Sequence, residues 1–197
     1  TNHEELEGDA EIALRGADAM IAFSAPGPGT VKPEWIKQMA KNAIVLAGAN
    51  PIPEIWPWEA AEAGAMVVAT GRSDFPNQVN NSLGFPGIFR GALDVRARTI
   101  TDEMAIAASE TLARMAEEKG LSPDHLLPTM EEWEIFPREA AAVAVKAVEQ
   151  GVAQLQTTYD EEYERASELI RQAREMTHLL MHEGFIAEGP EADDERK

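Results

Sequence analysis

The residues best suited to binding a polar ligand lie in one stretch, Ala69 to Gly91, which reads ATGRSDFPNQVNNSLGFPGIFRG. It holds two neighbouring asparagines, Asn80 and Asn81, together with two arginines and several glycines. An asparagine amide both donates and accepts hydrogen bonds, so it can hold a carboxylate, a hydroxyl or a carboxamide. The apolar run 65–69 leads directly into this stretch. Because open α/β folds place ligands in loops after buried strands, we expect a binding loop here.

Two more polar loops follow apolar runs earlier in the chain. The run 17–24 ends at Ser24 and Ala25, where prolines and glycines force a turn. Small residues there would let a dinucleotide approach the main chain. The run 43–48 is followed by Asn50, whose amide could hold a substrate carboxylate or hydroxyl, or a nicotinamide carboxamide.

Each of these residues also has a purely structural interpretation. Ser24 and Ala25 suit a plain tight turn, and Asn50 suits a turn-forming Asn-Pro pair. One of Asn80 and Asn81 can cap the helix that follows while its neighbour faces the ligand. Asp74, close to Arg72, suits an internal ion pair or a cap better than a catalytic base.

Apolar runs and helical patterns alternate in the first half of the chain. The predicted strands are 17–24, 43–48 and 65–69, and the predicted helices between them are 32–41 and 58–63. Each run is apolar on both faces, which is typical of a parallel sheet covered on both sides. The pattern predicts an α/β fold with three neighbouring strand ends on one sheet edge, where the polar loops converge.

The second half is predicted to be helical. Helices are expected at 85–95, at 101–119 with Thr101 as its cap, at 138–149 and at 159–182, with a proline-interrupted loop at 121–137. The last helix is amphipathic, with a stripe near heptad spacing: Tyr163, Ala166, Ile170, Ala173, Thr177 and Leu180. We therefore divide the chain into a sheet-containing domain at 1–151, a helical extension at 152–187 and a charged tail at 188–197, predicted to be disordered.

Composition excludes several classes of protein. Thirty-five acidic residues against 17 basic ones give a formal net charge of −18, which opposes binding to nucleic acid. No apolar run is long enough to cross a membrane, and the absence of cysteine excludes disulfides and cysteine metal sites. The acidic N-terminus does not resemble a signal peptide and lacks a starting Met, so we expect a cytoplasmic protein and a processed or excised piece. The acidity fits either ordinary solvation or adaptation to high salt.

The groups that would carry out a reaction are missing from the predicted sheet edge. No lysine lies there, and the two tyrosines, Tyr159 and Tyr163, fall on the last helix. The chain contains no Gly-x-Gly-x-x-Gly loop and no acidic cluster at that edge. His178 and His182 are four residues apart, but no third metal ligand accompanies them. We therefore expect no catalytic and no metal-ligating residue in this chain.

Three long motifs carry a family resemblance: NPIPE from Asn50, VATGRSDFPNQVNN from Val68 and FPGIFRGALDV from Phe85. They resemble the C-terminal half of the NAD(P)-binding domain of malic enzymes in their shorter prokaryotic form. The similarity extends from about Gly8 to Gly151. It implies a Rossmann-like parallel sheet, the second half only, with a C-terminal helical extension.

Malic enzymes oxidise malate with NAD or NADP and decarboxylate the product to pyruvate, using Mg²⁺ or Mn²⁺. The resemblance implies that Asn50 and Asn81, and less securely Asn80, bind substrate. It also implies that Ser24, Ala25, Asn50 and Asn81 lie against the dinucleotide. The family's catalytic lysine and tyrosine, metal ligands and phosphate loop have no counterpart in this chain.

The expected partners are therefore malate or pyruvate, the rest of the enzyme, and further copies in a homo-oligomer, with a dimer favoured. We expect the chain alone to be inactive. NAD and NADP cannot be distinguished, because the residue that reads the ribose 2′ position follows an earlier strand.

Two other functions stay open at this point. One is a fragment of another Rossmann dehydrogenase, of amino-acid or folate type, which the combined Asn-Pro and Asn-Asn motifs disfavour. The other is a non-catalytic nucleotide-binding or oligomerisation module, with helix 159–182 as its interaction element.

Overall fold

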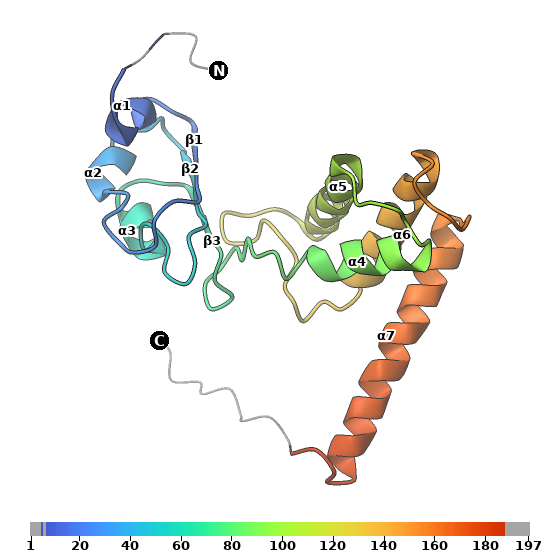
Figure 1. Cartoon of the computed structure of the whole chain (residues 1–197). Helices are drawn as coiled ribbons and strands as arrows, with labels where there is room; N and C mark the ends of the chain where they lie inside the picture. Colours follow the sequence, from blue (N-terminus) through green and yellow to red (C-terminus); the bar gives the residue numbers. More distant parts are fainter. Residues whose placement is uncertain (1–4, 6, 188–197) are drawn as a thin grey trace.

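A computed structural model describes residues 5 and 7–187 of the chain, which form a sheet-containing lobe and a helical lobe (Figure 1). The first lobe comprises α1 (Ala10–Leu14), β1 (Ala19–Ala22), α2 (Pro33–Ile36), β2 (Ile44–Ala47), α3 (Pro57–Glu62) and β3 (Val67–Thr70). The strands are parallel in the order β1-β2-β3. Their register pairs Ala22 with Ala47 and Ala47 with Thr70, so the three carboxyl ends are level. The α/β fold and the shared sheet edge are thus confirmed.

One face of this sheet is covered and the other is largely open. Met20 and Val45 point into a core that α1, α2 and α3 complete, with Ile36 and Ala60 among its buried residues. On the opposite face, Ile21 is 67% exposed and Ile44 is 40% exposed. The expectation of a sheet covered on both sides is therefore wrong for the described residues, because their helices pack on one face of β1 and β2.

Four helices build the second lobe: α4 (Phe85–Asp94), α5 (Asp102–Lys119), α6 (Ile135–Glu149) and α7 (Tyr159–His182). Thr101 caps α5 as predicted, accepting a hydrogen bond from the Met104 amide. α6 begins at Ile135 rather than Arg138, because a proline is tolerated in the first turn of a helix and Pro137 lies there. α4 and α5 both pack against α6, so α6 is the central helix of this lobe.

Two loops, 71–84 and 120–134, run between the lobes (Figure 1). Asn77 ties them to the sheet, and its side chain uses all its groups in doing so. Its amide donates to the carbonyls of Val68 (3.0 Å) and Pro123 (2.6 Å), and its Oδ1 accepts from the Leu126 amide (2.9 Å). The loop that follows β3 is therefore held against the loop between α5 and α6.

α7 is attached to the lobe by its first turns alone, and the rest projects away from it (Figure 1). Glu162 and Ala166 are its buried residues, and Glu162 pairs with Arg165 at 2.8 Å. Burial and the neighbouring Asp94 raise the pKa of the Glu162 carboxyl. The predicted bounds of the helix are confirmed. Of its predicted stripe only Ala166 is buried, and the predicted disorder of 188–197 falls outside the described residues.

The part of the chain that the structure describes contains no helix with the length and hydrophobicity needed to cross a membrane.

Candidate functional site

Glu54 joins the loops that follow β1 and β2. This carboxylate is fully buried, and its Oε1 accepts hydrogen bonds from the Ser24 amide (2.7 Å) and the Ser24 hydroxyl (3.1 Å). Its Oε2 accepts from the Ala49 amide at 3.0 Å. The backbone adds a second link, since the Val31 amide donates to the Glu54 carbonyl. Ser24 and Asn50, which follows Ala49, are therefore fixed side by side.

Arg72 joins the loop after β2 to the loop after β3. Its guanidinium donates to the Pro51 carbonyl at 3.0 Å and forms a two-point ion pair with Asp74, with distances of 2.8 and 2.6 Å. The guanidinium also lies 5.3 Å from the centre of the Phe75 ring. Asp74 thus has the arginine partner that we expected, and Asn50 is connected through Pro51 to the Asn80–Asn81 loop.

The two neighbouring asparagines have different environments. The Asn80 amide donates to the Gly71 carbonyl at 2.5 Å, and its Oδ1 accepts from the Ser82 amide at 2.9 Å, so this side chain braces the loop. The Asn81 side chain is exposed and makes no hydrogen bond to any described residue. α4 begins without a side-chain cap, so neither asparagine caps it. Asn81 is therefore the one with a side chain available to a ligand.

A cavity of about 380 Å³ brings this loop together with the end of β1. Phe23, Asn80 and Asn81 line it, with Leu83, Ser109 and Leu112 among the other lining residues. Ser24 and Ala25, which follow Phe23, are exposed, as is Asn50 at the end of the neighbouring strand. A Cβ atom added at Gly27 would meet nothing within 4 Å. This sheet edge thus combines apolar lining residues, an asparagine side-chain amide and exposed main chain.

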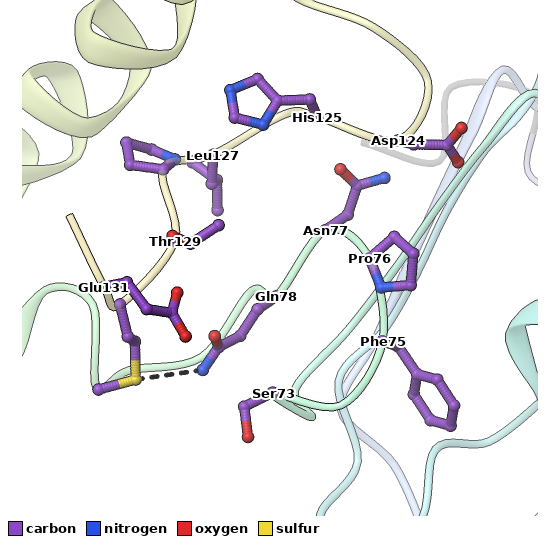
Figure 2. Close-up of a pocket in the computed structure, with 12 residues that line it drawn as sticks. Ser73, Phe75, Pro76, Asn77, Gln78, Asp124, His125, Leu127, Thr129 and Glu131 are labelled. Atoms are coloured by element: carbon purple, nitrogen blue, oxygen red, sulfur yellow. Dashed lines mark hydrogen bonds between the residues drawn. The ribbon is translucent and has the colours of Figure 1, made fainter. Parts of the chain in front are cut away.

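A second cavity, of about 410 Å³, lies between the two connecting loops (Figure 2). Ser73 and residues 75–78 form one wall, and residues 124–125 and 127–131 form the other. The Gln78 side-chain amide lies 3.5 Å from the Met130 sulfur, and a dashed line in Figure 2 joins Gln78 to this sulfur atom. Sequence reasoning missed this cavity because 121–137 carries no motif, and because its walls are joined by contacts between distant segments, such as those of Asn77 and Gln78.

Within residues 5 and 7–187 no set of side chains is suited to metal chemistry. No group of three or more histidine, aspartate or glutamate side chains there could hold a metal ion. His178 and His182 lie on exposed turns of α7. Lys32, the lysine nearest in sequence to Ser24, lies 5.3 Å from the Trp35 ring. The arrangement can position a ligand, and the described residues offer no evident acid or base at Asn81.

Glu54 is the functional residue that sequence reasoning left without a role. It stands in the NPIPE motif, where an acidic side chain between apolar residues and prolines was the available signal. Two of its three donors come from Ser24, 30 positions earlier in the chain. Local sequence therefore could not reveal that this carboxylate joins two strand ends.

Comparison with known proteins gives a consistent family. The profile described as "Malic enzyme, NAD binding domain" matches residues 16–151. The bifunctional malic/malolactic enzyme of Bacillus subtilis (strain 168) is 48% identical over 169 residues, which cover 86% of this chain and 41% of that protein. The NAD-dependent malic enzyme of Geobacillus stearothermophilus is 48% identical over 153 residues, covering 78% of this chain and 31% of that protein.

A solved structure agrees with these sequence matches. The crystal structure of Entamoeba histolytica malic enzyme superposes with a TM-score of 0.92 at 54% identity, covering 96% of this chain and 39% of that one. The chain thus spans less than half the length of each of these three proteins.

Proposed function

The chain belongs to the malic enzyme family, and from that membership we propose that it forms the wall of a malic enzyme that binds the nicotinamide dinucleotide and holds malate against it. The whole enzyme would oxidise malate and decarboxylate the product to pyruvate. In this proposal the 197 residues position both ligands, and the groups that react with malate belong to the rest of the enzyme.

The observation that carries this proposal is the contrast between the two asparagines. Asn80 is fully engaged in bracing its loop, whereas the Asn81 side chain makes no hydrogen bond to the described residues and lines the cavity beside Phe23. A polar side chain held ready for a ligand on a braced loop is the arrangement expected of a binding residue. We therefore assign substrate contact to Asn81 and Asn50, and a supporting role to Asn80.

The dinucleotide fits the residues at the end of β1. Residues 24–26 are exposed, and nothing lies within 4 Å of the Cβ position at Gly27, so a ligand can approach the backbone there. We propose that Ser24 and Ala25 contact the dinucleotide, with Asn50 and Asn81 at its nicotinamide end. When bound, NAD or NADP supplies the hydride acceptor. The names of the relatives are consistent with either cofactor.

A divalent metal does not fit the described residues, because they contain no cluster of three ligating side chains. We therefore derive no step through Mg²⁺ or Mn²⁺ from this chain. The ligands of that ion, the catalytic lysine and the catalytic tyrosine are proposed to come from the remainder of the full-length enzyme.

Replacing Asn81 with alanine in the full-length enzyme is expected to lower kcat/KM for malate by about 10²–10³-fold, the usual cost of losing one positioned polar group. The measurement is dinucleotide reduction at saturating cofactor. Asn80→Ala should instead lower thermal stability, because it removes the two side-chain hydrogen bonds by which Asn80 holds the loop. Gln156→Ala, at an exposed amide far from the edge, is the matched control and should leave both unchanged. Wild-type kcat/KM in Asn81→Ala would contradict the proposal.

A second role, oligomerisation, is favoured by the projecting half of α7. Leu169, Met176 and Leu179 are 44%, 63% and 58% exposed along it. Exposed apolar side chains on one helix, such as these three, are costly to leave in water. Ending the full-length enzyme after Ser167 keeps the buried contacts of Glu162 and Ala166 and removes Leu169, Met176 and Leu179. We expect light scattering to report a smaller assembly for the shortened protein, and an unchanged mass would exclude α7 as the contact.

A further inference from the structure

Glu139 is a buried carboxyl group with no evident partner. It lies on α6 with none of its surface exposed, and neither Oε1 nor Oε2 has a hydrogen-bond donor among the described residues. A carboxyl group in such a place is stable only in its neutral form, because burying an unpaired charge costs far more than burying an acid. Burial accordingly raises the pKa of Glu139 to about 9.

The carboxyl lies directly against the first turn of α4. A Cβ atom added at Gly87 would lie 2.6 Å from Glu139 Oε2 and 2.4 Å from its Cβ. At Gly84 it would lie 3.8 Å from Oε1. Gly87 therefore makes room for this side chain, Gly84 lies in contact with it, and any movement of the carboxyl is transmitted to the backbone of that turn.

The same turn is hydrogen-bonded to the two asparagines. The Leu83 amide donates to the Asn80 carbonyl at 3.0 Å, and the amides of Gly84 and Phe85 donate to the Asn81 carbonyl at 3.1 and 2.9 Å. Leu83 itself is buried, which anchors the connection in the helical lobe. The position of Asn81 therefore depends on the turn that rests on Glu139.

No neighbouring charge stabilises an ionised Glu139. Three arginines on or beside α6 form ion pairs with other carboxylates: Arg90 with Asp94, Arg138 with Glu118, and Arg165 with Glu162. Burial is the sole cause of the shift in the pKa of Glu139. If it loses its proton, the buried charge can be relieved only by water entering beneath α4 or by movement of the helix turn.

We propose that the neutral carboxyl of Glu139 is a positioning group for Asn81, and that its ionisation displaces the first turn of α4 and weakens malate binding. Glu139 touches neither ligand in this proposal and acts through residues 81–87. The inference rests on the proposed function, since it takes Asn81 to be the malate contact.

The sign of the accompanying stability change follows from the raised pKa. An unfolded chain releases this proton near the ordinary glutamate value, whereas the folded chain keeps it until about pH 9. The unfolded state therefore binds fewer protons in that window, and the contribution of Glu139 to stability falls as pH rises through it. Glu139→Gln, which imitates the neutral acid, lacks this loss and should fold at least as stably as the wild type at pH 8.

The test compares the full-length wild type with Glu139→Gln between pH 8 and pH 10. At one unit above the pKa about nine-tenths of the groups are ionised, so KM for malate should rise about tenfold in the wild type while kcat changes little. In Glu139→Gln the KM should change less than about twofold across the same range. Glu110→Gln, at an exposed carboxylate on α5, should behave as the wild type. An equal rise in KM in Glu139→Gln overturns the proposal.

A second measurement separates this inference from the assignment of malate. Limited proteolysis by an alkaline protease, with cleavage between residues 71 and 90 followed by mass spectrometry, reports movement of the turn without any substrate. The ratio of wild-type to Glu139→Gln cleavage rates, taken at equal pH, should be near one at pH 7.5 and severalfold higher at pH 10. A ratio of one throughout overturns the proposal even if malate is the substrate. A raised ratio in a protein that does not oxidise malate would contradict only the proposed function.

Discussion

Glu54→Ala is expected to lower the free energy of unfolding by about 3–5 kcal/mol, because it leaves two backbone amides and a hydroxyl without their charged acceptor. Ser24 donates two of these hydrogen bonds and Ala49 the third, and Ala49 is itself buried. For a protein of this size such a loss corresponds to a fall of roughly 10 °C in Tm. Thermal melting, repeated by chemical denaturation, measures it.

The same substitution should weaken dinucleotide binding more than a loss of stability alone would explain. Glu54 is what holds Ser24 and the Asn50 turn together, so its removal frees the main chain that the dinucleotide is proposed to contact. Binding to folded protein then has to order that loop, at a cost of about 1–2 kcal/mol for each fixed residue. Fluorescence titration of the full-length enzyme with the dinucleotide, well below Tm, gives the change in Kd.

Two variants test whether the buried carboxylate of Glu54 is the cause of the expected loss of stability. Glu54→Gln keeps the shape and one acceptor oxygen, so its loss of stability should lie between those of the wild type and Glu54→Ala. Glu62→Ala removes an exposed carboxylate from α3, and surface changes of this kind stay within about 0.5 kcal/mol. A Tm for Glu54→Ala within two or three degrees of the wild type would show that water replaces the carboxylate without cost.

The strand and helix pattern could be predicted from sequence because each element carries its own signal. The apolar run 43–48 contains β2, and the 159–182 helix has the bounds that its amphipathic pattern indicates. The meeting of three strand ends followed from parallel topology, since Ala22, Ala47 and Thr70 share one register. Asn50, Asn80 and Asn81 were recognised as candidates for the same reason, although their roles remain predictions.

What sequence could not provide are the contacts made between distant segments. Glu54 and Asn77 are both buried polar residues with partners as far as 30 and 46 positions away, so local sequence does not identify those partners. Glu139 lies in an alanine- and valine-rich helix where an acidic residue suggests a solvated face, but the helix packs against Gly87 of α4 and buries it. The open face of β1 and β2 shows the opposite limit. An apolar pattern indicates that a sheet face is buried, but it does not identify the element that covers it.

Gly91→Ala is expected to destabilise the helical lobe by about 2–3 kcal/mol, the range found when a tightly packed core is overfilled. An added Cβ at Gly91 would lie 2.3 Å from the Ala140 carbonyl oxygen and 3.0 Å from Val143 Cβ. A backbone oxygen cannot rotate away as a side chain can, so α4 and α6 must separate. Alanine is the better helix former by about 1 kcal/mol, but this gain is smaller than the expected strain. Chemical denaturation measures the difference.

Gly84→Ala is the matched control, because it makes the same substitution at the start of the same helix. Its added Cβ would meet neighbours at 3.8 and 3.9 Å, which is ordinary van der Waals contact, so we expect a change within about 0.5 kcal/mol. A Gly91→Ala protein as stable as the wild type would mean that α4 moves away from α6 without cost. In that case α4 could not hold Asn81 firmly either, and KM for malate should already be raised at neutral pH. A stable Gly91→Ala protein with an unchanged KM would therefore argue against close α4–α6 packing as the support of the substrate loop.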